Sequence, residues 1–205
     1  MKFEELGLEG AFLIKPRIFP DERGLFTETF SQPAFEDAVG HPMTIAQVNM
    51  SSSRRGTIRG LHAVALPSGQ ARYAMCVRGS IVDIVVDVRL GSPTFGENVP
   101  VVLDDDNRHA LYLAEGLAHG FAPLTDEATV VYLCSSTYAP QATIQVNPLD
   151  PALDLPWPKE EKVLLSKQDR SAPSLKEAID LGVLPDYAEC RDHIARLRDR
   201  ALEGA

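Results

Sequence analysis

Hydrophobic and polar positions between residues 44 and 150 follow a β pattern. Short runs rich in valine, isoleucine, tyrosine and leucine recur there, and glycine, proline, aspartate or asparagine separates one run from the next. The runs that we predict as strands are residues 73–77, 80–89, 99–103, 110–113, 120–124 and 128–135. Regularly spaced short strands with no helix between them are typical of antiparallel sandwiches and barrels. The pattern therefore predicts an all-β core of the jelly-roll type.

The two ends of the chain depart from this pattern. Residues 1–30 indicate short strands around a turn at residues 20–24, and residues 33–39 indicate a short helix. Ser174 and Glu177 have the spacing of a capping box at the start of a helix. Cys190, Ile194 and Leu197 then recur at helical spacing between charged residues. We expect one domain over residues 1–205, with the jelly roll at about 10–155 and a C-terminal helical segment at about 172–203.

The net charge of the chain limits the kinds of molecule that it is expected to bind. The 205-residue chain has 20 lysine and arginine residues against 29 acidic residues, which gives a net charge of −9. A chain this acidic is a poor general binder of nucleic acid or anionic membranes, so an anionic ligand needs a local cluster of basic side chains. We expect neither a membrane helix nor a signal peptide, because no apolar run is long enough for either. Three cysteines without paired spacing indicate reduced thiols and a cytoplasmic location.

Residues 47–62 form the densest polar segment. They include three arginines, two side-chain amides, four hydroxyls and His62. Guanidinium groups match phosphate oxygens, and amides and hydroxyls suit a nucleobase or a sugar. The residues alone are equally compatible with a solvated polar loop. His62 and His119 lie in glycine-containing junctions, and the mouth of a barrel often binds ligands. Neither has a closely spaced second ligand, so we expect no metal.

Taken in order, the motifs of this chain resemble those of the dTDP-4-dehydrorhamnose 3,5-epimerases and related nucleotide-sugar epimerases. The similar segments are residues 21–28, 47–51, 59–62, 79–87, 91–96, 115–121, 132–135, 150–151, 157–158 and 165–169. The resemblance implies a cupin-type jelly roll, a homodimer, and no metal or redox cofactor. It implies a dTDP-linked 4-keto-6-deoxysugar as the substrate. The reaction removes a proton beside the C4 ketone and returns one to the opposite face, which needs a base, an acid and a cation near the enolate oxygen.

The same resemblance suggests a role for each candidate residue. His62 resembles the base, Asp169 the acid that orients it, and Tyr132 the proton donor on the other face. His119 and Arg72 match positions near the C4 oxygen. The residues expected to hold the thymidine and diphosphate are Arg23, Glu28, Gln47, Asn49 and Arg59, with Arg23 and Glu28 acting across the dimer interface. Tyr138 completes the candidate substrate-binding residues.

Three departures from the family pattern leave the substrate open. Arg72 stands where the family commonly has lysine, residues 143–145 read Thr-Ile-Gln where it often has Glu-His-Gly, and Gln168 precedes Asp169. The sequence therefore leaves open whether C3, C5 or both are inverted. Two alternatives also stay open at this point. One is a cyclase or isomerase of a non-nucleotide metabolite on the same fold, and the other is a non-catalytic sugar-nucleotide binding module.

Overall fold

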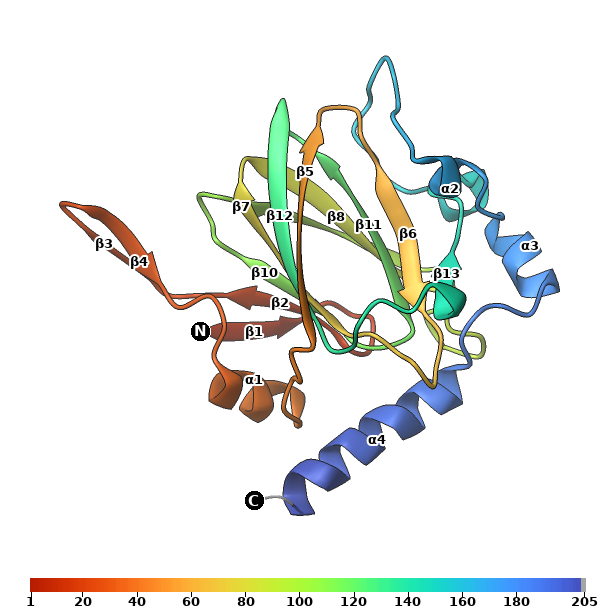
Figure 1. Ribbon diagram of the computed structural model, residues 1–205, viewed down its shortest axis with the longest axis horizontal. Coiled ribbons are helices and arrows are strands. Elements are labelled where there is room, and N and C mark those ends of the chain that lie inside the picture. Colours follow the sequence, from red (N-terminus) through yellow and green to blue (C-terminus); the bar gives the residue numbers. More distant parts are fainter. Residues whose placement is uncertain (204–205) are drawn as a thin grey trace.

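Two antiparallel β-sheets form the body of the computed structural model, which describes residues 1–203 (Figure 1). The first sheet has the order β1 (Lys2–Glu5), β2 (Ala11–Lys15), β10 (Ala110–Leu113), β7 (Arg72–Arg78), β12 (Glu127–Cys134), β5 (Gln47–Arg54). The second has the order β13 (Thr143–Gln145), β6 (Arg59–Val64), β11 (Leu117–Pro123), β8 (Ser80–Asp87), β9 (Asn98–Asp104). This arrangement confirms the predicted jelly roll. Strand β10 has the predicted bounds.

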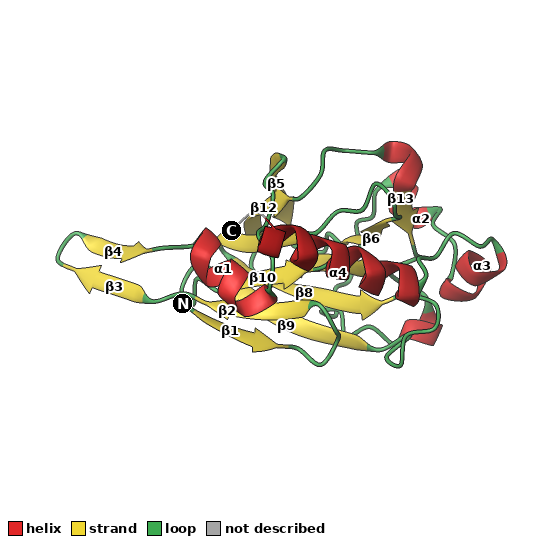
Figure 2. Ribbon diagram, turned by 90° about the horizontal axis from the view of Figure 1, so that it is seen from below, coloured by secondary structure: helices red, strands yellow, loops and turns green. Residues whose placement is uncertain are grey.

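Two kinds of appendage surround the sheets. The hairpin of β3 (Ile18–Asp21) and β4 (Gly24–Thr27) projects away from the body (Figures 1 and 2). The helices are α1 (Gln32–Val39), α2 (Lys167–Arg170), α3 (Leu175–Asp180) and α4 (Tyr187–Glu203), with single 3₁₀ turns at Pro140–Ala142 and Pro151–Leu153. Helix α3 begins at the predicted capping box, where Ser174 and Glu177 exchange hydrogen bonds. Among residues 1–203, no helix is long and apolar enough to cross a membrane.

The surroundings of β8 explain why apolar and polar residues do not alternate regularly along this strand. Ile81 and Val85 pack into one apolar cluster, whereas Val82, Ile84 and Val86 pack into another on the opposite face. The second cluster includes Leu175 and Ala178 of α3, which covers the outside of this sheet. A strand buried on both faces has apolar residues on both, so the period of two disappears.

Residues 47–62 form β5 and the beginning of β6, which a short turn at residues 55–58 joins. Gln47, Asn49 and Ser51 of β5 are half-buried and point into the space between the sheets, whereas Val48 and Met50 are 57% and 71% exposed. This order is the reverse of the usual apolar-inside alternation, which is why the segment resembles a solvated loop. His119, which the sequence placed at a glycine-containing junction just before the predicted strand at 120–124, lies within a strand, β11, that is buried on both faces.

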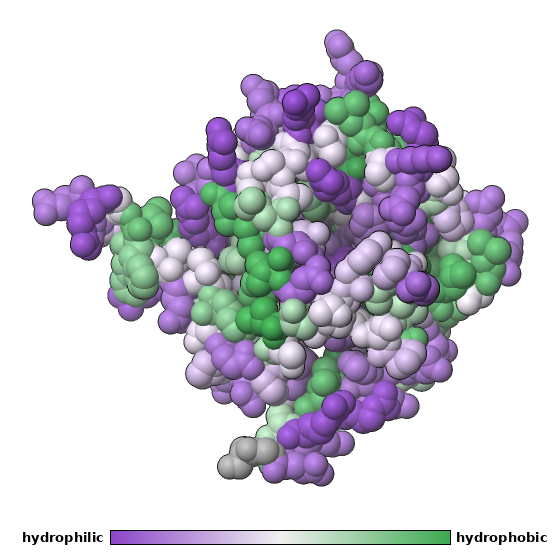
Figure 3. Space-filling model, in the orientation of Figure 1, coloured by the Kyte–Doolittle hydropathy of each residue, from purple (hydrophilic) through white to green (hydrophobic). Residues whose placement is uncertain are grey.

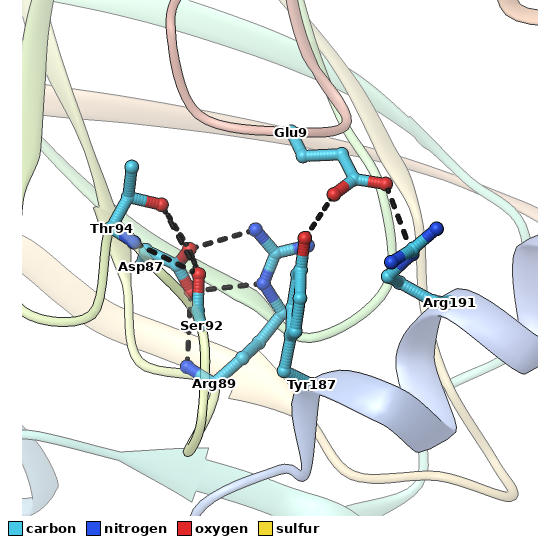
Figure 4. A network of polar contacts seen from close by, with 7 residues as sticks. All are labelled: Glu9, Asp87, Arg89, Ser92, Thr94, Tyr187 and Arg191. Carbon is cyan, nitrogen blue, oxygen red and sulfur yellow. Dashed lines mark hydrogen bonds and ion pairs between the residues drawn. The ribbon is translucent and has the colours of Figure 1, made fainter.

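A buried ion pair at the end of β8 lies against the first residue of α4 (Figure 4). Arg89 donates two hydrogen bonds of 2.9 and 2.8 Å to the carboxylate of Asp87, and the hydroxyls of Ser92 and Thr94 donate to the same carboxylate. Burial alone would raise the pKa of Asp87, but these bonds outweigh it and lower that pKa. Arg89 Cζ lies over the ring of Tyr187, the first residue of α4, at 5.1 Å from the centroid of that ring. The helix is therefore held to the barrel at its N-terminal end.

The cysteines show no disulfide. Cys76, Cys134 and Cys190 are free and buried within the described part of the chain. Burial raises the pKa of the Cys76 and Cys190 thiols to about 11, so both are protonated at neutral pH.

Candidate active site

A cavity of about 320 Å³ opens between the two sheets. Strands β5, β6, β7, β11, β12 and β13 line it together with α2. Nine of the predicted site residues contribute to its wall: His62, Tyr132, Asp169, Gln47, Asn49, Arg59, Arg72, His119 and Tyr138. The other two do not. Arg23 lies in the turn of the projecting hairpin and Glu28 follows it, and both are exposed.

His62 and Asp169 form a hydrogen-bonded pair at this cavity. His62 Nε2 lies 2.7 Å from Asp169 Oδ1, and Ser166 donates to the other carboxylate oxygen at 2.8 Å. Burial alone would raise the pKa of Asp169, but the bonds from His62 and Ser166 outweigh it, and the pKa lies below its ordinary value. An ionised carboxylate accepts the Nε2 proton, so Nδ1 of a neutral imidazole keeps its lone pair. His62 can therefore accept a proton at Nδ1.

A second histidine–aspartate pair lies on the neighbouring strands. His119 Nδ1 is 2.9 and 3.1 Å from the two carboxylate oxygens of Asp83, which is fully buried on β8. His119 lies directly opposite His62 in the β6–β11 register, so the two imidazoles line one wall. We did not predict Asp83 as a site residue. The sequence contained a sign of its role, because an acidic residue within an otherwise apolar buried strand is rarely left without a hydrogen-bonding partner.

Arg72 places a positive charge beside His62. Its Nη1 donates to the backbone carbonyl of His62 at 3.0 Å, and its Nε donates to Gln70 Oε1 at 3.2 Å. Burial lowers the pKa of the guanidinium, yet arginine remains charged at neutral pH. Within residues 1–203, Arg72 makes no ion pair with a carboxylate. A desolvated cation of this kind is suited to stabilising an anion that forms in the cavity. Gln70, which orients it, was also absent from our prediction.

Tyr132 reaches the cavity from the opposite sheet. It lies on β12 of the first sheet, whereas His62 lies on β6 of the second, and both line the same space. A ligand in that space therefore has an imidazole on one side and a phenol on the other. This geometry allows removal of a proton from one face of a carbon atom and delivery of a proton to the other.

The β5 side of the cavity is a row of neutral polar groups with one arginine. Gln47 donates to Asn49 Oδ1 at 2.8 Å and accepts from the backbone N–H of Tyr138 at 2.9 Å. Arg59 donates to Ser53 Oγ at 2.8 Å and has no carboxylate partner among the described residues. Amides, an aromatic ring and an unneutralised guanidinium suit a nucleobase and a phosphate.

Two glycines set the spacing of the histidine strands. A Cβ atom on Gly60 would lie 2.5 Å from Gly120 Cα and 2.8 Å from the carbonyl oxygen of His119. Gly60 also has a φ of +134°, which side-chain-bearing residues rarely adopt. Strands β6 and β11 approach this closely only because both positions lack a side chain. The contact lies within two residues of His62 and adjoins His119.

The family comparison agrees with this chemistry. Residues 5–177 match the family model described as dTDP-4-dehydrorhamnose 3,5-epimerase. A dTDP-4-dehydrorhamnose 3,5-epimerase of Mycolicibacterium smegmatis is 46% identical over 198 residues, which cover 97% of this chain and 98% of that protein. A dTDP-4-dehydro-6-deoxyglucose 3-epimerase of Streptomyces bikiniensis is 50% identical over 182 residues, which cover 89% of this chain and 93% of that protein.

Solved structures show the same fold. ChmJ, a 3'-monoepimerase from Streptomyces bikiniensis in complex with dTDP-quinovose, superposes with a TM-score of 0.92 at 47% identity. The superposition covers 94% of this chain and 98% of that one.

Proposed function

This chain belongs to the dTDP-4-dehydrorhamnose 3,5-epimerase family, and from that premise we propose which of its residues carry the reaction. The protein is an epimerase of a dTDP-4-keto-6-deoxyhexose in deoxysugar biosynthesis, as the motifs indicated. His62 is the base, Asp169 orients it, and Tyr132 is the acid on the opposite face. The observation that carries this assignment is the position of the imidazole and the phenol on opposite walls of one cavity.

The reaction starts with proton transfer to His62. The imidazole takes the proton from a carbon beside the C4 ketone. The C–H electron pair forms a double bond from that carbon to C4, and the π pair of the C4 carbonyl moves onto O4 to give an enolate. Arg72 and the His119–Asp83 pair stabilise that charge. Tyr132 then donates its hydroxyl proton to the other face, and the enolate electrons form the new C–H bond. Exchange with solvent restores the proton on Tyr132 and removes the one on His62.

The nucleotide lies along β5 in this assignment. Arg59 binds a phosphate, and Gln47, Asn49 and Tyr138 contact the thymidine. These groups also separate the two alternatives that the sequence left open. A non-nucleotide substrate would give them no ligand, and a pure binding module would not need a histidine–aspartate pair facing a tyrosine. A cytoplasmic location stays a prediction.

A homodimer accounts for the apolar surface of the first sheet. Val48 and Met50 on β5, together with Phe26 on the hairpin, are 57%, 71% and 67% exposed. Figure 3 shows apolar side chains over this face and at the base of the hairpin. β5 is also an edge strand, so one of its sides has unpaired backbone groups. Pairing of two copies through this face would carry Arg23 and Glu28 toward the cavity of the partner subunit.

Met50→Glu tests the dimer. We expect light scattering to give the mass of two chains for the wild type and of one chain for this variant, because a charge would be buried without a partner. Leu202→Glu, on the far end of α4, is the control and keeps the dimer mass, since that side chain is 80% exposed. A wild-type protein that is monomeric at micromolar concentration contradicts the proposal.

Solvent exchange tests the reaction itself. In deuterated water, with the dTDP-linked 4-keto-6-deoxyglucose and a metal chelator present, we expect NMR to show deuterium entering the sugar beside the ketone. A thermal shift with dTDP alone checks nucleotide binding separately. Nucleotide binding without any deuterium uptake would favour the binding module, and uptake without a shift by dTDP would contradict the assignment of β5.

A further inference from the structure

Gln145 is a cavity residue that the reaction described above does not use. It ends β13 and lies directly opposite His62 in the antiparallel register with β6. Side chains opposite each other in such a pair project to the same face, with Cβ atoms about 5 Å apart. Gln145 and His62 both line the cavity, whereas Ile144, the residue before Gln145 on β13, is buried in the apolar cluster on the other face of the sheet. The Gln145 amide is therefore beside the imidazole.

The side-chain amide of Gln145 is available for a ligand. Within residues 1–203 it makes no side-chain hydrogen bond. Two other polar side chains of the cavity wall are already engaged, since the Thr143 hydroxyl donates to the carbonyl of Ala139 at 3.2 Å and Gln70 bonds both Arg72 and Ser136. Gln145 thus offers two N–H donors and a carbonyl acceptor to whatever part of the sugar lies next to His62.

The substrate offers two different edges to this pair of side chains. The two carbons beside the C4 ketone are C3, which carries a hydroxyl, and C5, which carries a methyl group. With C3 at His62, the amide can bind a hydroxyl. With C5 at His62, the amide lies against the methyl group and the ring oxygen, which accepts but does not donate a hydrogen bond, so the amide carbonyl is left desolvated without a partner, which is costly. Sites that hydrogen-bond a hydroxyl discriminate strongly against groups that lack it.

We propose that Gln145 is a specificity-determining residue that binds the hydroxyl on the carbon facing His62 and so favours proton removal at C3 over C5. This inference rests on the assignment of His62 as the base. It names the reacting carbon, which the family membership leaves open, since relatives of this chain include both 3-epimerases and 3,5-epimerases.

The experiment compares exchange at the two carbons. The dTDP-linked 4-keto-6-deoxyglucose is incubated in deuterated water with the wild type or with Gln145→Leu, and NMR follows the C3 and C5 proton signals separately. We expect the wild type to exchange C3 faster than C5. Gln145→Leu keeps the side-chain size but removes the hydrogen bonds, so the ratio of C3 to C5 exchange is expected to fall by at least about tenfold.

Two further variants serve as controls for this experiment. Thr143→Val makes a similar polar-to-apolar change two positions earlier on β13, where the hydroxyl is already engaged, and is expected to keep the wild-type ratio. Gln145→Glu retains acceptors for the sugar hydroxyl and is expected to keep C3 preferred. The affinity for dTDP, measured by calorimetry, verifies that each variant is folded.

The outcomes are distinct. An unchanged ratio in Gln145→Leu with intact dTDP affinity overturns the inference, and so does wild-type exchange at C5 as fast as at C3. An equal fall of the ratio in Thr143→Val also overturns it, since the effect would then not belong to Gln145. Absence of exchange at both carbons in the wild type instead refutes the proposed reaction, and the inference with it.

Discussion

Replacing His62 with alanine is expected to lower the turnover number for epimerisation by at least about a hundredfold. The Asp169 carboxylate orients this imidazole at 2.7 Å, so the other ring nitrogen is free to take up the proton. His119 is anchored on the neighbouring strand by buried Asp83 and is assigned to the enolate oxygen, so it does not occupy the position of the His62 imidazole. The rate is measured by NMR of the product sugar at saturating substrate.

Nucleotide affinity separates a lost base from a lost fold. Because the thymidine and diphosphate groups are assigned to β5 and Arg59, His62→Ala is expected to bind dTDP about as tightly as the wild type. His109→Ala is the matched control, since His109 does not line the cavity and its loss is expected to leave the rate unchanged. A His62→Ala enzyme within a few-fold of wild-type turnover would contradict the mechanism.

Replacing Tyr132 with phenylalanine is expected to separate exchange from inversion. The variant keeps the ring on β12 but removes the hydroxyl proton that is delivered to the second face. His62 can still form the enolate and return a solvent deuteron to the face from which it took the proton. Net inversion is expected to fall about a hundredfold, whereas deuterium exchange with retained configuration falls much less.

The two signals are read in one NMR time course. Loss of the substrate proton signal reports exchange, and the appearance of the epimer's coupling pattern reports inversion. Tyr138→Phe removes a hydroxyl from the exposed rim of the same cavity and is expected to keep the wild-type proportion of the two. If exchange and inversion fell in parallel in Tyr132→Phe, the phenol would not be the second-face donor.

The β core was predictable because local signals agree with the tertiary fold. Turn residues separate short apolar runs, and the run at residues 110–113 has the bounds of β10. Residues 47–54 could not be assigned from the pattern, because β5 turns its polar side chains inward and exposes Val48 and Met50. That inversion makes sense only with a ligand on one side and, in our proposal, a second subunit on the other.

The sequence indicated residues that share one cavity, but not how they connect to one another. Motif resemblance pointed to His62, Tyr132 and Asp169, and these line one cavity. The partnership of His119 with Asp83 depends on the register of β8 against β11, which no local pattern specifies. The position of Arg23 fits the expectation better: the turn at residues 20–24 is the tip of the hairpin, which lies outside the cavity of its own chain.

The glycine contact between β6 and β11 divides the cavity wall into a part that evolution can alter and a part that it cannot. Any side chain at Gly60 or Gly120 would force the strands apart and separate the imidazoles. On β13 and α2, by contrast, Gln145 and Gln168 can change without moving the backbone that carries His62. New sugar preferences in descendants of this scaffold are therefore expected to arise on the β13 side, while the chemistry is inherited unchanged.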